Sequence, residues 1–184
     1  MQKEINIWLN YNPHKNKRLA KPYSDAILQQ LLQNTLNTSA RIAIKKSKNG
    51  KPYVDEPIFF SHSNCRQLHA YVITTAHDIG IDVEYINKKR AVMKLASRYF
   101  HPKESKIITD LPTAEKSSMF FKQWTHKEAW CKLDGGNLWS YLNKLPGDEK
   151  GLFLYESDRI DGYALAIASP QKIDKIRINS IGNQ

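Results

Sequence analysis

Hydrophobic and polar residues alternate over eight short segments of the chain, a pattern typical of β-strands. These strands are expected at residues 4–10, 41–47, 58–63, 68–75, 78–86, 152–157, 163–169 and 175–181. Apolar residues instead recur at helical spacing over residues of about 25–37, 90–100, 102–110 and 114–133. A helix followed by several strands thus occurs twice, which favours a two-lobed α+β protein over alternating βαβ units.

The first helix and the hairpin after it carry local signals of their own. Residues 11–23 are basic and interrupted by proline, so we expect a loop there. Ser24 is expected to cap the helix that follows. Asn49 and Gly50 predict a tight turn. The apolar stripe of the helix is formed by Ile27, Leu28, Leu31, Leu32 and Leu36.

Composition narrows the class of protein. Hydrophobic residues make up 41% of the 184 residues, enough to build a core, and the net charge of +10 favours an anionic partner: nucleic acid, a phosphorylated cofactor or an acidic protein. The two cysteines, Cys65 and Cys131, have no metal-like spacing, which fits a reduced, cytoplasmic setting. No run approaches the ~18 apolar residues of a membrane span, so we expect a soluble protein that does not bind membranes.

Two carboxylates lie in the strand DIGIDVEY. Alternation places Gly80, Asp82 and Glu84 on one face, with the two acids roughly 6.5–7 Å apart. Taken alone, the pattern is explained more simply by an ordinary strand with one solvent-exposed face. Like charges on one face repel each other, however, unless a cation lies between them.

A third carboxylate, Glu128, is predicted on the apolar side of the long helix. The stripe that surrounds it is formed by Ser117, Phe120, Phe121, Trp124 and Cys131. A helical pair with Lys132 would contribute only ~0.3–0.5 kcal/mol, too little to offset the burial of a carboxylate. A divalent cation shared with Asp82 and Glu84 explains the position better, and three carboxylates suit Mg²⁺ with phosphate oxygens as further ligands. The pattern therefore indicates pyrophosphate or nucleotide chemistry.

Two upstream segments are candidates for binding an anion and a flat ring. Ser61, His62 and Ser63 supply donors at a strand end, where a charged His62 would bind phosphate. A hydroxyl-lined turn is the simpler alternative. Lys51 follows the tight turn, and the rigid ring of Pro52 can stack on a flat ligand, although a plain hairpin explains this segment too.

Taken in order, these segments resemble the 4′-phosphopantetheinyl transferases, and within them the larger, Sfp-like group. The resemblance covers residues of about 50–135 and rests on GKP (50–52), IFFSHS (58–63), GIDVE (80–84), RYFHPKE (98–104) and WTHKEAWCK (124–132). It implies an enzyme of the holo-acyl-carrier-protein synthase type. Such an enzyme moves the 4′-phosphopantetheine arm of coenzyme A onto a serine of an acyl or peptidyl carrier protein, with Mg²⁺ as the usual metal.

The resemblance also implies a fold and partners. The family fold is an α+β pseudo-dimer of two similar lobes, each a helix packed on a small antiparallel sheet. Here the lobes would be residues 1–86 and 87–184, with the active site in the cleft between them. A pseudo-dimer favours a monomer, and the basic surface suits an acidic carrier protein.

Matched residue by residue, the resemblance assigns the metal and the reacting groups. Asp82 and Glu128 would bind Mg²⁺, and Glu84 would be a third ligand or hold a metal-bound water. Lys132 would contact the pyrophosphate. Glu104 would be the base, or hold the water, that takes the proton of the carrier serine.

The same matching assigns the coenzyme A contacts. Ser61 and His62 would bind the 3′-phosphate, and Lys51 and Pro52 would line the adenine end. Lys127 would lie near the phosphates or at the mouth of the cleft. The chain departs from the family in its first helix, which lacks an arginine that reaches the 3′-phosphate. The basic residues that can replace it are Arg18, Arg41, Lys45 and Lys46.

Two other functions compete with the transferase. A nucleic-acid-binding module fits the net charge of +10 and the aromatic content of 10%, but basic and aromatic residues are not interleaved on one element as stacking requires. A binding protein that keeps the transferase fold without catalysis is the other alternative. The complete set of Asp82, Glu84, Glu128 and Lys132 argues against this loss.

Overall fold

The computed structural model describes residues 4–182 of the chain. The helices are α1 (Lys17–Leu36), α2 (Val92–Tyr99), α3 (Pro102–Asp110), α4 (Thr113–Asp134), α5 (Trp139–Leu142) and the 3-10 helix η1 (Pro146–Asp148). The strands are β1 (Glu4–Tyr11), β2 (Lys45–Lys46), β3 (Pro52–Tyr53), β4 (Phe59–Cys65), β5 (Leu68–Thr74), β6 (Gly80–Tyr85), β7 (Phe153–Ser157), β8 (Tyr163–Ser169) and β9 (Lys175–Ser180). Within this range, no helix combines the length and the apolar character that crossing a bilayer demands.

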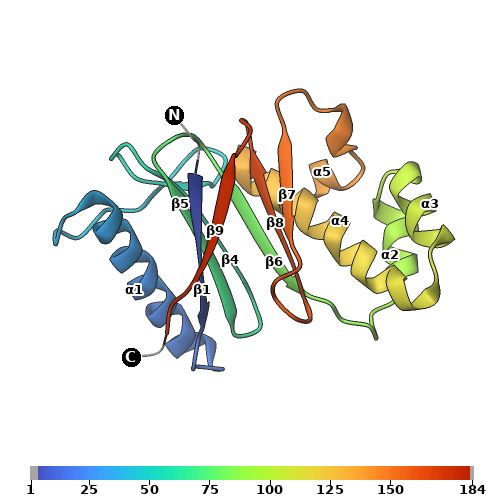
Figure 1. The fold of residues 1–184 in the computed structure, drawn as a ribbon, viewed down its shortest axis with the longest axis horizontal. Helices are drawn as coiled ribbons and strands as arrows, with labels where there is room; N and C mark the ends of the chain where they lie inside the picture. The colour runs from blue at the N-terminus through green and yellow to red at the C-terminus, as the bar shows by residue number, and fades with distance from the viewer. Residues whose placement is uncertain (1–3, 183–184) are drawn as a thin grey trace.

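The strands form two larger sheets and one short hairpin (Figure 1). The first sheet has the order β4-β5-β1-β9, antiparallel except for the parallel pair β1 and β9. The second, β6-β8-β7, is antiparallel throughout. Strand β6 from the first half of the chain therefore completes the second sheet, and β9 from the chain's end completes the first. The mixed α+β class expected from the sequence is confirmed.

The core is layered from one end of the molecule to the other (Figure 1). Helix α1 packs its leucine stripe against one side of the first sheet, where it meets Phe60, Tyr71 and Ile73. A second cluster, which includes Ile7 of β1 and Ile81 of β6, joins the two larger sheets. Helix α4 covers the second sheet and separates it from α2 and α3. Because α4 has neighbours on several sides, it is the helix that links the sheets to the rest of the C-terminal half.

Most predicted elements match, but α1 begins earlier than expected. Its N-cap is Asn16, whose side chain accepts a hydrogen bond from the amide of Arg18 at 2.8 Å. Ser24 lies inside the helix and donates to the carbonyl of Lys21 at 3.0 Å, so its predicted role as the cap is wrong. Pro22 removes one amide hydrogen near the start of the helix. The cap and the buried apolar stripe nevertheless hold this turn in helical form.

The hairpin after α1 is shorter than predicted. Only Lys45 and Lys46 of the expected strand 41–47 pair, with Tyr53 and Pro52 of β3. The tight turn is confirmed, since Gly50 has φ of +83° and its amide donates to the carbonyl of Ser47 at 2.9 Å. The hairpin leads into β4, which forms one wall of the candidate site.

Candidate active site

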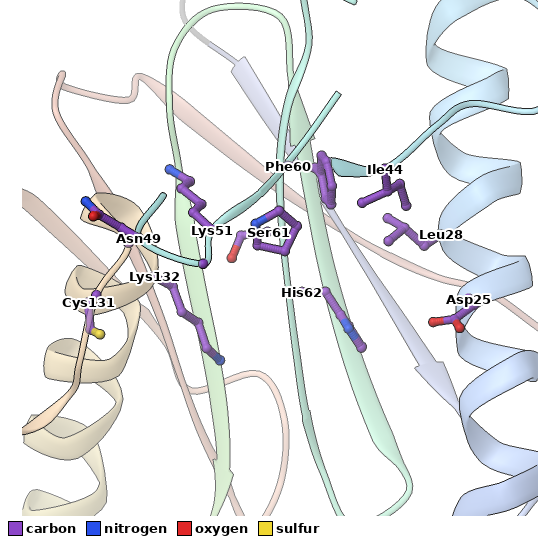
Figure 2. A pocket seen from close by; sticks show the side chains of 14 residues that line it. Asp25, Leu28, Ile44, Asn49, Lys51, Phe60, Ser61, His62, Cys131 and Lys132 are labelled. Atoms are coloured by element: carbon purple, nitrogen blue, oxygen red, sulfur yellow. The ribbon is translucent and has the colours of Figure 1, made fainter. Parts of the chain in front are cut away.

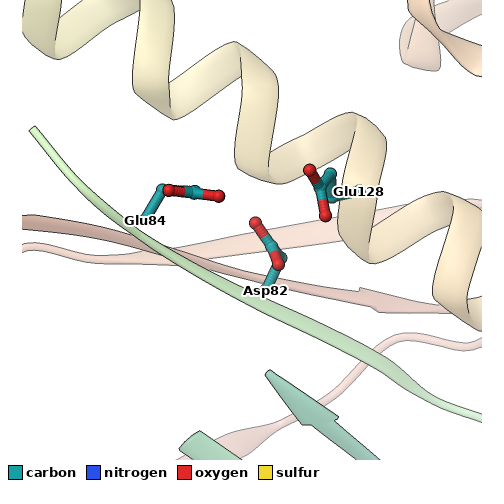
Figure 3. A group of neighbouring side chains, drawn as sticks. All are labelled: Asp82, Glu84 and Glu128. Atoms are coloured by element: carbon teal, nitrogen blue, oxygen red, sulfur yellow. The ribbon is translucent and has the colours of Figure 1, made fainter. Parts of the chain in front are cut away.

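Strand β6 and helix α4 bring three carboxylates together (Figure 3). Asp82 and Glu84 point from β6 toward Glu128 of α4, and one oxygen from each lies within 4.8 Å of the others. The close approach depends on Gly80, because a Cβ there would lie 2.0 Å from the carbonyl oxygen of Ala129. The sequence pattern thus predicted correctly that Asp82 and Glu84 lie on the same face of the strand as Gly80. In the structure this face packs against α4.

Asp82 is the buried member of the three. Its Oδ1 accepts hydrogen bonds from Lys132 Nζ and from Ser63 Oγ, each at 2.7 Å. Its Oδ2 is buried and has no hydrogen-bond partner among residues 4–182. Leaving a carboxylate oxygen buried without a partner is costly, so this oxygen is a natural ligand for a cation.

The surroundings of the other two carboxylates, Glu128 and Glu84, oppose their ionisation. Burial, with a contribution from Asp82, raises the pKa of Glu128 to about 7, even though Trp124 Nε1 donates to its Oε1 at 2.7 Å. Burial also raises the pKa of Glu84, whose Oε2 accepts from Cys65 Sγ at 3.2 Å. A divalent cation would favour the ionised form of both. Three carboxylates with one free buried oxygen are hard donors of the kind that Mg²⁺ prefers.

Lys132 connects the carboxylates to a cavity. The helical pair with Glu128, the alternative set aside in the sequence analysis, does not form: the Lys132 ammonium bonds to Asp82, and Glu128 bonds to Trp124. The Lys132 side chain is 30% exposed, so part of it remains accessible. A basic group therefore lies between the carboxylates and the open space beside them.

The cavity has a volume of about 380 Å³ and lies between α1 and the end of α4 (Figure 2). Asp25 and Leu28 border it on the α1 side, and Cys131 and Lys132 on the α4 side. The remaining lining comes from the hairpin, β4 and the turn after α4. The sequence-predicted residues that line it are Lys51, Pro52, Ser61, His62 and Lys132.

His62 is neutral at physiological pH, which corrects the expectation of a charged ring. Burial is the main cause that lowers its pKa to about 3, and the electrostatic effects of His69 and Lys132 add to it. The ring stacks on Tyr71, with centroids 4.5 Å apart, and on His69 at 5.2 Å. The sequence could not reveal this stack, because all three residues come together only when β4 pairs with β5.

The hydrogen-bond partners around His62 favour one tautomer of its ring. Asn12 is oriented by its loop, since Nδ2 donates to Ala20 at 2.8 Å and Oδ1 accepts from His14 at 3.0 Å. Because Nδ2 lies 3.5 Å from His69 Nε2, that ring nitrogen is the acceptor. The pKa of His69 is lowered by burial, so the neutral ring donates from Nδ1 to His62 Nε2 at 3.0 Å. His62 then carries its own hydrogen on Nδ1 and acts as an uncharged donor.

Lys51 holds the hairpin against the end of α4. Its ammonium donates to the carbonyl of Leu133 and to Asp78 Oδ1, the latter at 2.8 Å. A lysine at the C-terminus of a helix satisfies a free carbonyl and opposes the negative end of the helix dipole. Lys51 therefore shapes the cavity wall and, together with the exposed Pro52, borders the cavity.

Lys127 and Glu104 lie elsewhere, in the interior between α3 and α4. Lys127 is fully buried, and its ammonium lies 2.8 Å from Glu104 Oε2 and donates to the carbonyl of Lys144 at 2.6 Å. Burial lowers the pKa of Lys127 while Glu104 opposes the shift. Neither residue lines the cavity. This placement differs from the cleft mouth expected for Lys127, because the neighbouring acid draws its ammonium inward.

A second, more basic cavity of about 850 Å³ adjoins the first and shares Asp25 and His62 with it. The residues suggested to replace a first-helix arginine, Arg18, Arg41, Lys45 and Lys46, do not line it, although Arg18 proves to lie in α1. Lys17 and Lys21 of α1 do, because the helix begins earlier than predicted and so turns them toward β4. The basic residues in its lining are Lys15, Lys17, Lys21 and Arg66.

Comparison with known proteins agrees with this geometry. Residues 78–167, which hold all three carboxylates, match the model of the 4′-phosphopantetheinyl transferase superfamily. Over these residues the chain is therefore similar to members of that superfamily, and the relatives described next carry the same name.

Several relatives carry the same name. The chain is 28% identical over 134 residues to the 4′-phosphopantetheinyl transferase HetI of Nostoc sp., which covers 70% of this chain and 56% of HetI. It is 26% identical over 159 residues to the transferase gsp of Aneurinibacillus migulanus, covering 79% and 66%. It is 25% identical over 142 residues to AcpT of Escherichia coli O157:H7, covering 76% and 71%. The match thus spans between half and two thirds of the length of HetI and gsp.

Proposed function

We propose that this chain transfers the 4′-phosphopantetheine group of coenzyme A to a serine of an apo acyl or peptidyl carrier protein. The reaction depends on Mg²⁺ and releases adenosine 3′,5′-bisphosphate. The observation that carries the proposal is the buried Oδ2 of Asp82, which lacks a partner among residues 4–182 and lies with two further carboxylates beside a lysine-lined cavity. The names of the relatives support the class of group that is transferred.

The carboxylates and Lys132 would act on the diphosphate. Asp82, Glu84 and Glu128 would hold Mg²⁺, which when bound offers positive charge to the diphosphate oxygens. Lys132 is already fixed by its bond to Asp82 and would stabilise the charge that builds on the departing nucleotide. Trp124 holds Glu128 in place, so both groups need little rearrangement as the reaction proceeds.

The two cavities would hold the nucleotide part of coenzyme A. Lys51 and Pro52 would border the adenine, and Ser61 would contribute a hydroxyl group. His62 would donate an uncharged hydrogen bond to the 3′-phosphate, while the positive charge would come from Lys17 and Lys21 of the second cavity, residues that the sequence alone did not suggest. A neutral donor with nearby cations binds a phosphate without requiring a buried imidazolium ion.

Glu104 is the carboxylate that we propose for the proton of the carrier serine, directly or through a water molecule. Its ion pair with Lys127 balances the buried charge and keeps the side chain in one position. On this proposal Lys127 supports the base instead of binding phosphate. Glu104→Gln should slow transfer while leaving the affinity for coenzyme A unchanged.

The arrangement of the chain and its charge suggest further features. We propose that residues 1–86 and 87–184 are two lobes of a pseudo-dimer, in which β6 and β9 are the strands that each half contributes to the sheet of the other. We expect a monomer in a cytoplasmic setting. The net charge of +10 suits an anionic partner. Because the relatives are named as transferases, we propose that this partner is an acidic carrier protein and not nucleic acid.

The direct test is a panel of apo carrier proteins incubated with the purified chain, coenzyme A and Mg²⁺, with the carrier mass as the readout. A gain of one phosphopantetheine group is expected for at least one carrier. Asp82→Ala and Glu128→Ala should abolish the gain, while Asp110→Ala, which removes an exposed carboxylate paired with Lys106, should not. A folded protein that modifies no carrier, or full activity of the Asp82 variant, would refute the proposal.

A further inference from the structure

Side chains of β4, rather than main-chain pairing, connect the two larger sheets at the candidate site. Strands β4 and β6 are edge strands of different sheets and lie next to each other (Figure 1). Three amides of β6 donate to three alternate side chains of β4 at a constant offset of 20 residues, so the strands run in the same direction. The bonds are Ile81 N to Ser61 Oγ at 3.1 Å, Val83 N to Ser63 Oγ at 3.3 Å and Tyr85 N to Cys65 Sγ at 3.2 Å.

Two of these side chains also donate a hydrogen bond to a carboxylate. Ser63 Oγ donates to Asp82 Oδ1 at 2.7 Å, and Cys65 Sγ donates to Glu84 Oε2 at 3.2 Å. A hydroxyl or thiol group has one hydrogen, and accepting the amide with a lone pair leaves that hydrogen for the acid. The rigid amides of β6 therefore set the direction in which Ser63 and Cys65 point their hydrogens.

We propose that Ser63 and Cys65 are positioning residues for Asp82 and Glu84, a role that rests on the proposed cation site. Ser63 and Lys132 both donate hydrogen bonds to Oδ1 of Asp82, so its buried Oδ2 is the oxygen left for the cation. Cys65 restrains Glu84 in the same way, although a thiol is a weaker donor than a hydroxyl. One row of side chains thus joins the sheets and orients two ligands.

The test is a Mn²⁺ titration of the purified chain without coenzyme A, in which electron paramagnetic resonance measures free Mn²⁺. Ser63→Ala should weaken Mn²⁺ binding about 10-fold or more, the range found when a partner of a metal ligand is removed. Ser61→Ala is the matched control: it removes a member of the same row that bonds to a β6 amide and to neither carboxylate. Its Mn²⁺ affinity should equal that of the wild type.

Cys65 offers a second pair of variants that does not depend on how Ser63→Ala folds. Cys65→Ala should bind Mn²⁺ several-fold more weakly than the wild type, whereas Cys65→Ser keeps a donor and should bind at least as well. Equal affinities for Cys65→Ala and Cys65→Ser, or for Ser63→Ala and Ser61→Ala, would overturn the proposal. So would a wild type that binds no Mn²⁺.

The outcome is separate from that of the transferase assay. A chain that binds Mn²⁺ in a manner that requires Asp82 and Ser63, yet modifies no carrier protein, would refute the proposed function and support the positioning role. A chain that modifies carriers while Ser63→Ala keeps full Mn²⁺ affinity would support the function and refute the positioning role.

Discussion

The contact between Gly80 and α4 gives the sharpest stability prediction. A Cβ at residue 80 would lie 2.0 Å from the carbonyl oxygen of Ala129 and 2.6 Å from the amide nitrogen of Leu133, both main-chain atoms. Ordinary contacts begin near 3.4 Å, so Gly80→Ala requires β6 and α4 to separate by 3.4 minus 2.0, or 1.4 Å. Main-chain atoms of two packed elements cannot move aside individually.

We expect Gly80→Ala to lower the free energy of unfolding by about 3 kcal/mol, at the upper end of the usual cost of overpacking. For a chain of this size that corresponds to a melting temperature roughly 6–12 °C lower. The measurement is urea and thermal unfolding followed by circular dichroism. Because Glu128 lies on α4, the same shift should weaken Mn²⁺ binding by the folded variant.

Gly147→Ala is the control for this prediction. No atom lies within 4 Å of the Cβ that would be built there, and the backbone is not left-handed. Its stability should stay within about 0.5 kcal/mol of the wild type, as for most surface substitutions. A Gly80→Ala protein as stable as Gly147→Ala would show that α4 does not press on β6 as described.

Three further predictions concern titration and buried charge. The pKa of Glu128 is raised from 4.5 to about 7, so in the absence of divalent cations its protonated form contributes a free energy of unfolding that is fully present below about pH 4.5 and is lost as the pH rises through 7. Urea unfolding from pH 5 to 8 should show this loss, and Glu128→Gln should reduce it. The ring nitrogens of His62, with a pKa of about 3, should show constant ¹⁵N chemical shifts from pH 5 to 8, with the proton on Nδ1. Lys127→Met should cost about 3–5 kcal/mol because it leaves Glu104 buried without its cation, and adding Glu104→Gln should recover part of the loss.

Each of these has a clear contrary result. Stability of the cation-free protein that is flat or rises between pH 5 and 8 would contradict the environment assigned to Glu128. A His62 titration with a midpoint near 6.5 would show that the ring is not desolvated by its stack. A Lys127→Met protein that melts with the wild type, or a double variant no more stable than the single one, would refute the ion pair as a buried, coupled unit.

The periodic parts of the fold were accessible from the sequence. The alternation in GIDVEY predicted correctly which residues share a face of β6, because successive side chains of a strand point to opposite sides. The bounds of α3 were predicted correctly, aided by Pro102 in its first turn. The start of α1 was not, because the basic, proline-interrupted residues 11–23 indicated a loop, whereas the helix begins after an Asn16 cap and contains Pro22.

The position of Lys127, which the sequence did not predict, has a simple geometric explanation. Lys127 adjoins Glu128 in sequence, but neighbouring residues of a helix point about 100° apart, at 3.6 residues per turn. Glu128 therefore faces β6 while Lys127 faces Glu104 on α3. Choosing between these faces requires knowledge of what surrounds α4, and α4 is covered on more sides than one apolar stripe suggests.

The sequence did not predict the side-chain contacts between strands, because these too depend on what surrounds each element. The side-chain row from β4 to β6 and the neutral state of His62 depend on how β4 packs against two other strands, β6 and β5. The alternation of Ser61, Ser63 and Cys65 was a signal that could have been noticed, since three small polar side chains on one face of a strand are able to bond to a neighbouring backbone.

The parallel pair of β1 and β9 has a consequence for how the protein is made. On the edge of β1 that faces away from β5, residues 4–9 pair with residues 175–180, so the first sheet keeps this main-chain edge open until residues 175–180 have left the ribosome. The most N-terminal strand, synthesised first, is thus among the last to be fully paired. Ribosome-bound chains that stop before β9 should remain sensitive to proteases along β1 and become resistant once the final strand emerges.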